Sequence, residues 1–182
     1  MDGSGNAYVT GRFSETVDFD PGSGVDNHTS NGQDDVFLSK LDSSGDFVWA
    51  RTWGGNNWVM AIDSGNGVAV DSSGSVYVTG QFWNTVDFDP GSGIDNHTSN
   101  GWPSDFLSKF DSSGTFQWAE TWGGGGDGVG LESVAADGAG SVYVTGDFRD
   151  TVDFDPSSDV DNHISNGNID VFLVKFLPDG SW

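Results

Sequence analysis

Three loops of this sequence carry aspartates at the same spacing, and aspartate oxygens at this density are suitable ligands for calcium. The first two aspartates of each set lie on one side of an extended segment, where a cation would relieve their mutual repulsion. The sequence therefore predicts a structural calcium site in each loop. The alternative is that these side chains form turns by accepting hydrogen bonds from nearby backbone N–H groups. The residues are Asp18, Asp20 and Asp26, Asp87, Asp89 and Asp95, and Asp153, Asp155 and Asp161.

A histidine follows an Asp-Asn pair in each of these loops, at His28, His97 and His163. One imidazole from each copy, gathered near a common axis, would bind a transition metal. No second ligand stands at a spacing typical of zinc sites, so the sequence favours a solvated or capping role. Asn27 and Asn96 begin Asn-x-Thr sequons. These predict glycosylation if the chain passes through a eukaryotic secretory pathway.

The tryptophans fall into two groups. One group recurs at matching positions and predicts core packing between repeats: Trp49, Trp53, Trp118 and Trp122. The other group lies in loops and is not shared by the sister copies: Trp58, Trp83 and Trp102. Exposed loop tryptophans stack on sugar rings or contact proteins, so these three are candidate ligand-binding residues. The alternative is that the long loops partly bury them.

Catalytic groupings do not stand out. The sequence contains no Gly-x-Ser-x-Gly, no phosphate loop and no His-Glu-x-x-His. Lys40, Lys109 and Lys175 recur at one strand position, and we expect each to neutralise a nearby aspartate. The sequence therefore predicts that the protein is not an enzyme. A glycosidase or lyase stays open as an alternative, because carboxylates are abundant.

Three copies of one sequence unit organise the chain, at residues 1–55, 56–124 and 125–182, and together they predict one repeat array. Tyr-Val-Thr-Gly begins at residues 8, 77 and 143, and Val-Asp-Phe-Asp-Pro at 17, 86 and 152. The middle copy predicts strands at 68–70, 75–82, 86–89, 105–110 and 115–122, with a polar loop at 91–101. Four main strands in meander order predict an all-β fold of β-propeller-type blades.

The first and third copies each lack one strand of the middle copy. The first copy begins after the position of strand 68–70, and Trp182 falls at the start of a last strand. A closed propeller usually needs about four blades or more, so we expect no ring closed within this chain. We expect uncovered rings such as Phe172 and Trp182 at the open blade. An open edge also predicts self-association into a ring or fibre, or a place in a longer propeller.

The composition excludes several partners. The 182 residues include only 6 Lys and Arg, and the net charge is −22. Nucleic acids and anionic membrane surfaces are therefore excluded, because both require cationic side chains. There is no cysteine and hence no disulfide, and no apolar run is long enough to predict membrane insertion.

Three segments resemble the bacterial β-propeller repeat called SBBP: Asp71–Gly80, Asp35–Gly45 and Trp49–Gly55. The resemblance implies a secreted or surface-attached, multi-repeat bacterial protein without a family-wide active site. The second copy departs from the pattern, with Ser104-Asp105-Phe106 in place of Asp-Val-Phe. We therefore expect a non-enzymatic extracellular module for structure, adhesion or assembly. A carbohydrate-binding lectin is the first alternative.

Overall fold

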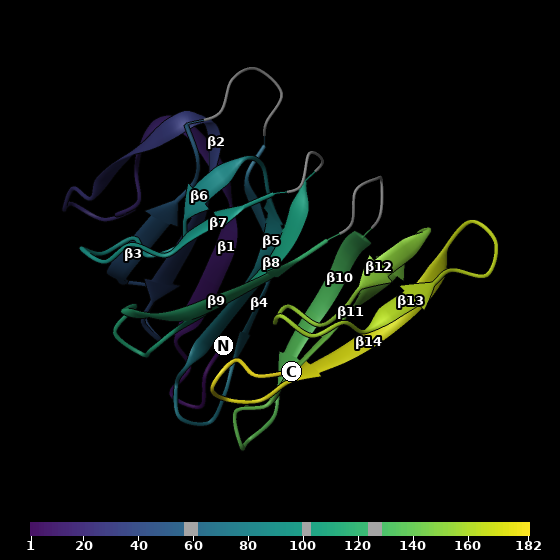
Figure 1. Cartoon of the computed structure of the whole chain (residues 1–182). Coiled ribbons are helices and arrows are strands. Elements are labelled where there is room, and N and C mark those ends of the chain that lie inside the picture. Colours follow the sequence, from purple (N-terminus) through teal and green to yellow (C-terminus); the bar gives the residue numbers. More distant parts are fainter. Residues whose placement is uncertain (57–61, 100–102, 124–128) are drawn as a thin grey trace.

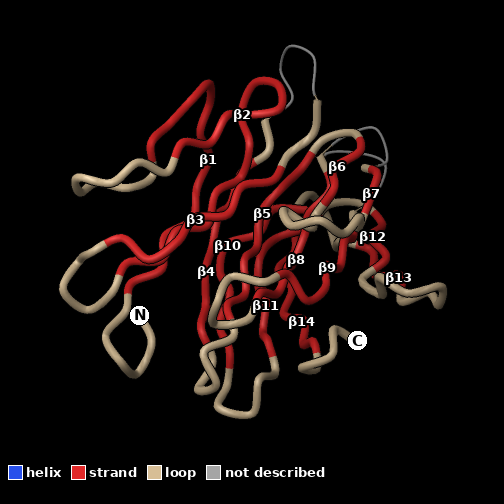
Figure 2. The backbone as a smooth tube through the Cα atoms, turned by 90° about the vertical axis from the view of Figure 1, so that its left-hand side faces the viewer, coloured by secondary structure: helices blue, strands red, loops and turns tan. Residues whose placement is uncertain are grey.

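The computed structural model describes residues 1–56, 62–99, 103–123 and 129–182. These residues form antiparallel sheets joined by turns and loops, and they contain no helix (Figure 2). Three main sheets lie side by side (Figure 1) and do not close into a ring within the described residues. The prediction of an all-β fold with propeller-type blades is confirmed. No described segment forms a helix able to cross a membrane.

Each main sheet follows the meander order expected from the repeats. The first contains β1 (Ala7–Asp18), β2 (Asn27–Leu41) and β3 (Phe47–Trp53). The second, in the order β4-β5-β8-β9, contains β4 (Ser64–Val70), β5 (Val76–Phe82), β8 (Ser104–Phe110) and β9 (Phe116–Trp122). The third contains β10 (Val129–Ala136), β11 (Val142–Phe148) and β14 (Asp170–Phe176). In this third sheet β14 is an edge strand.

A small hairpin accompanies the second and third sheets. β6 (Thr85–Asp87) pairs with β7 (Asn96–Thr98), and β12 (Thr151–Asp153) pairs with β13 (Asn162–Ile164). In the first sheet the same pairing is part of β1 and β2, which run on past a bulge. β7 lies inside the segment predicted as loop 91–101, so that part of the prediction is wrong. A run of Asn, His and Thr gives no hydrophobic alternation from which a strand could be read.

The tight turns between strands follow one chemical pattern. In the turn that begins at Asp71, its carboxylate Oδ1 accepts hydrogen bonds from the N–H groups of Ser73 (2.8 Å) and Ser75 (3.0 Å). Gly74 closes the turn at φ 85°, a left-handed conformation that glycine adopts without strain. The turn beginning at Asp111 repeats these bonds. Aspartate at the first position and glycine at the fourth therefore fix where the strands reverse.

The hydrophobic core lies between neighbouring sheets. Trp53 of the first sheet packs against Phe106 and Phe110 of the second, with ring centroids 6.1 and 5.2 Å apart. Trp122 of the second sheet packs against Phe176 of the third at 5.4 Å. The shared tryptophans thus lie between repeats, as the sequence predicts. Large rings supply most of the buried area, so each sheet depends on its neighbour to cover its apolar face.

Candidate interaction surfaces

The aspartates of the acidic loops bind the backbone of their own loops. Asp18 Oδ1 accepts hydrogen bonds from the N–H groups of Asp20 (3.1 Å) and Asp26 (2.8 Å). Asp20 Oδ1 accepts one from Gly22 N–H at 2.7 Å. The loops of the second and third repeats make the corresponding contacts. This is the turn-forming arrangement named as the alternative to calcium.

Calcium binding by these loops stays a prediction. Calcium takes six to eight oxygen ligands. Among the described residues, no group of three or more His, Asp or Glu side chains converges in a way that could hold a metal ion. A calcium site in a loop would therefore need backbone carbonyls and a rearrangement of the turn bonds. The histidines do not gather near an axis either; each stays within its own repeat.

Each of the first two histidines bridges its hairpin to the outer strand of its sheet. His28 Nδ1 lies 2.9 Å from Thr52 Oγ1 in β3, and His97 Nδ1 lies 2.8 Å from Thr121 Oγ1 in β9. The other ring nitrogen faces an aspartate of the loop at 3.3 Å, Asp26 or Asp95. The histidines therefore have a structural role in the first two repeats, close to the capping role favoured by the sequence.

The repeated lysines connect one sheet to the next. Lys40 Nζ lies 5.2 Å from the centre of the Tyr8 ring and donates a hydrogen bond to the Ser112 carbonyl at 3.2 Å. Lys109 Nζ lies 5.4 Å from the Tyr77 ring and donates to the Pro178 carbonyl at 2.7 Å. Within the described residues, no ion pair includes a lysine. Their direct partners are turn carbonyls and ring faces, but two of them still act on aspartates at longer range. The pKa of Asp179 is lowered chiefly by hydrogen bonds from Ser181 and in part by the charge of Lys109. The pKa of Asp137 is lowered chiefly by the hydrogen bond from Ser141 N–H and in part by the charge of Lys175.

The two interfaces between sheets differ in charge at one position. Arg51 in β3 donates hydrogen bonds to the carbonyls of Gly114 (2.8 Å) and Ser113 (3.1 Å) in the second sheet. Glu120 holds the matching position in β9. Burial raises the pKa of Glu120 to about 7, and repulsion from Asp95 and Asp155 adds to the rise. At this position the second interface therefore carries a carboxyl group whose ionisation is unfavourable, whereas the first carries a hydrogen-bonded cation.

The outer face of the third sheet is uncovered. Leu38 in β2 and Leu107 in β8 are 0% exposed, whereas the matching Leu173 in β14 is 70% exposed. Val171, two residues earlier in the chain, is 82% exposed. Phe172, which we expected to be uncovered, is buried because it points the other way and stacks on Phe154 at 4.9 Å. Successive side chains of β14 point to opposite faces, so Val171 and Leu173 lie on the uncovered face and Phe172 lies on the covered one.

The first sheet has the complementary open face. Val78 in β5 and Val144 in β11 are 0% exposed, but the matching Val9 in β1 is 46% exposed. The two open faces correspond to the two sides of an internal interface. Comparison of burial between repeats, rather than any motif, is what identifies them.

The remaining predicted site residues are only partly placed. Trp83 is half-buried, and its backbone N–H donates a hydrogen bond to Asp63 Oδ1 at 2.8 Å. Trp58 and Trp102 lie outside the described residues. Asn27 and Asn96 are exposed at the starts of β2 and β7. Glycosylation and sugar binding stay predictions.

Residues 61–81, in the middle repeat, match the family model SBBP, a beta-propeller repeat. This segment of the chain is therefore similar to the SBBP propeller repeat. The match spans β4, the Asp71 turn and most of β5, which are two of the four strands of the complete blade. The resemblance seen in the sequence is thus confirmed.

Two curated proteins are similar to this repeat protein over most of its length. An uncharacterized WD repeat-containing protein of Acanthamoeba polyphaga mimivirus is 28% identical over 174 residues, covering 88% of this chain and 12% of the relative. The regulatory protein FlaEY of Caulobacter vibrioides is 29% identical over 183 residues, covering 97% of this chain and 17% of the relative. The chain thus spans less than a fifth of either relative.

Proposed function

We propose that this protein is a non-enzymatic assembly module, whose end sheets dock on further blades of the same kind. The observation that carries the proposal is the pair of uncovered faces, Leu173 with Val171 at one end and Val9 at the other. Their counterparts elsewhere in the chain are fully buried between sheets. Contiguous apolar surface that is buried in every equivalent place is a docking surface.

The partner that best fits both faces is a second copy of this chain. Lys175 Nζ lies 5.6 Å from the Tyr143 ring, as in the first two repeats, but donates to no turn carbonyl among the described residues. The turn beginning at Asp42 in the first sheet corresponds to the turn that binds Lys40 in the second. A head-to-tail contact would join Lys175 of one copy to this turn of the next. Repeating it yields a ring if the rotation closes and a fibre otherwise.

The location and cofactor belong to the same proposal. An extracellular or cell-surface location follows from the resemblance to secreted SBBP-type proteins. Calcium would act as a structural ion in the acidic loops, tightening them when bound to the folded state. The module needs no catalytic group, because its role lies in blade-to-blade contact.

Light scattering tests the proposal. We expect the wild-type chain at micromolar concentration to exceed the 19.2 kDa mass of one copy. Leu173→Asp should return it to one copy, because a charge in the docking face lacks a partner. Val25→Asp is the matched control, since Val25 is equally exposed but lies in a loop. A wild-type chain that stays at the mass of one copy would refute the proposal.

A further inference from the structure

A groove between the first and second sheets is lined by charged, hydroxyl and apolar groups. It is a cavity of about 380 Å³, with His28 and residues 50–52 on one side and residues 89–91 and 114–116 on the other. We call it the inter-repeat groove. All of the residues that line it belong to the first two repeats. Cavities of this size hold small ligands, and here the two walls come from sheets that pack against each other.

Arg51 is held in the groove as an unpaired cation. Its Nε and Nη2 donate hydrogen bonds to the carbonyls of Gly114 (2.8 Å) and Ser113 (3.1 Å), and its Nη1 donates to that of Ala50 (2.6 Å). Its guanidinium carbon lies 5.3 Å from the centre of the Trp49 ring. Within the described residues, no carboxylate forms an ion pair with it. A guanidinium has five N–H groups. The three bonds above leave two of them to donate to a ligand oxygen.

Asp89 supplies a hydrogen-bond acceptor on the opposite wall. Its Oδ1 accepts the Gly91 N–H at 2.7 Å, which fixes the carboxylate against its own turn. Its Oδ2 accepts no hydrogen bond from any part of the chain that the structure describes. Asp89 and Arg51 line the same cavity, yet they are not among the ion pairs of the described residues. A ligand can therefore bridge the two by accepting from the guanidinium and donating to the carboxylate.

Apolar surface completes the groove. Pro90 and Phe116 are both half-buried, and they line the same wall as Asp89. The Phe116 ring is fixed in place, because it packs edge to face on the buried Phe110 ring with centroids 5.8 Å apart. An aromatic ring held beside polar groups suits a ligand that has one apolar face and several hydroxyls.

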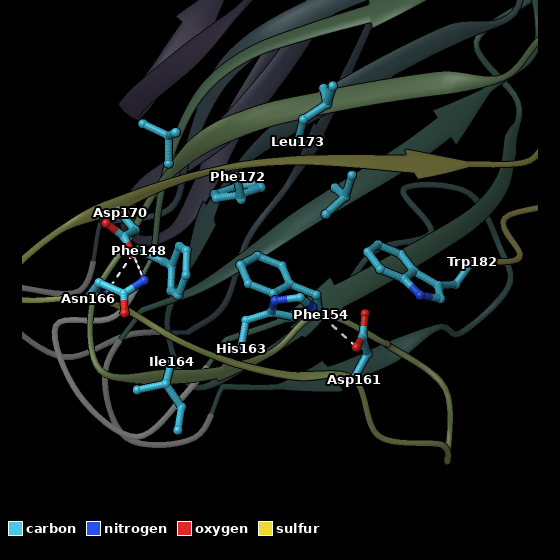
Figure 3. A pocket seen from close by; sticks show the side chains of 12 residues that line it. Phe148, Phe154, Asp161, His163, Ile164, Asn166, Asp170, Phe172, Leu173 and Trp182 are labelled. Atoms are coloured by element: carbon cyan, nitrogen blue, oxygen red, sulfur yellow. Dashed lines mark hydrogen bonds and ion pairs between the residues drawn. The ribbon is translucent and has the colours of Figure 1, made fainter.

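The joint between the second and third sheets lacks this arrangement. Glu120 stands there in place of Arg51, and loop aspartates of the second and third repeats repel it. That position therefore offers a ligand no guanidinium. The histidine does not distinguish the joints, because the histidine–aspartate pair recurs in every repeat, as Figure 3 shows for His163 and Asp161. Arg51 is thus the feature that is particular to the inter-repeat groove.

We propose that the inter-repeat groove binds one hexose unit of a neutral glycan. A hydroxyl both donates and accepts hydrogen bonds, so the hydroxyls of one sugar can satisfy Arg51 and Asp89 together. The apolar face of the sugar ring then lies on Phe116. A neutral ligand is favoured because the charges of the two side chains cancel, while the net charge of −22 repels anions. The site is additional to the assembly function, since it uses neither the docking faces nor the loop tryptophans.

Saturation-transfer difference NMR on the full chain tests the site, with the methyl glycosides of glucose, galactose and mannose as probes. Their blocked anomeric carbon mimics a unit within a glycan, and the method works whatever the mass of the assembly. We expect saturable binding of at least one glycoside in the presence of chelator, with a Kd of about 1–10 mM. The uronic acid and the amino sugar of that hexose, which each add one charge, should bind more weakly.

Two variants locate the binding. Asp89→Asn keeps an acceptor for the Gly91 N–H but makes it neutral, so the glycoside affinity should fall about 5-fold. Arg51→Gln removes a charged donor and should lower the affinity about 10-fold. Asp155→Asn and Glu120→Gln change the matching positions of the other joint and should leave the affinity unchanged. Melting curves show whether each variant folds, and Asp89→Asn alone decides if Arg51→Gln does not.

Three results would overturn the inference. One is the absence of saturable binding by any of the three glycosides, and another is an affinity that neither groove variant lowers. The third is tighter binding of the uronic acid, or of free phenylalanine, than of the neutral glycoside, which would assign the groove to an anion or an amino acid. Leu173→Asp changes only a docking face and should keep the glycoside affinity, so failure of this site and failure of assembly are separate results.

Discussion

Replacing Asp105 with valine should stabilise the protein at neutral and alkaline pH. Asp105 is 4% exposed and faces the third sheet. The residue at the matching position of the first repeat is Val36, which is fully buried. Burial raises the pKa of Asp105 well above its ordinary value, and repulsion from Asp147 adds to the rise. No ion pair within the described part of the chain neutralises this carboxylate. An uncompensated buried charge of this kind destabilises the fold.

The pH dependence has a definite sign. Because the pKa is raised in the folded state, stability is greatest when Asp105 is neutral and falls as the pH rises through the folded-state pKa. Exchanging a buried charged group for a well-packed aliphatic one contributes about 2 kcal/mol. For a chain of this size that raises Tm by about 4–8 °C at pH 8. The gain should shrink towards pH 4, where the wild-type carboxyl is protonated.

Thermal unfolding followed by circular dichroism at pH 4 to 8 measures both effects. Asp147→Asn is the matched control, since it removes the neighbouring charge but leaves Asp105 buried, and should give a smaller gain. A Tm for Asp105→Val below that of the wild type at pH 8 would show that the carboxylate has a stabilising partner. A gain that is the same at every pH would show that ionisation of Asp105 is not what destabilises the fold.

Three further predictions concern single side chains. Glu120→Gln should stabilise the fold by about 1 kcal/mol at pH 8 and by nothing near pH 4, because its raised pKa makes the ionised form costly and solvent screens part of that cost; melting curves at the two pH values decide this. Asp87→Ala should cost about 1–2 kcal/mol in chemical unfolding, in calcium or in chelator alike, whereas Asp87→Asn keeps an acceptor for the loop N–H groups; a calcium-dependent loss in both variants would favour the ion site instead. Gly80→Ala should cost about 1–3 kcal/mol, since its Cβ would meet the Phe106 ring and a backbone carbonyl. Gly3→Ala, with open space around it, is the comparison, and equal stabilities would contradict the packing reason.

Repetition made most of the fold readable from sequence. Three aligned copies predict the meander strands and their turns, and Trp53 and Trp122 fall between sheets as their periodicity requires. The pairing of β6 with β7 could not be read, because its strands are short and polar. Polar strands of this kind are held by their neighbours and lack a hydrophobic pattern of their own.

The candidate surfaces were harder to predict, because burial depends on which side of a strand meets a neighbour. The sequence identifies an open blade but not that Phe172 is covered while Leu173 is bare. Likewise, charge counting pairs Lys40 with an aspartate, whereas geometry brings a carbonyl closer. The group that a side chain contacts on the next repeat depends on how closely the two sheets pack, and the sequence of one repeat does not reveal that distance.

The lysine contact between sheets has a consequence for how such chains can grow. Lys40 binds the main-chain carbonyl of Ser112, and Lys109 that of Pro178, so the same contact forms with two unlike turn sequences. A main-chain acceptor is present whatever the side chain at that place. Gene duplication can therefore add or exchange repeats without matching substitutions in the turn that accepts the lysine hydrogen bond. Drift within the turns then leaves the connection between old and new copies intact.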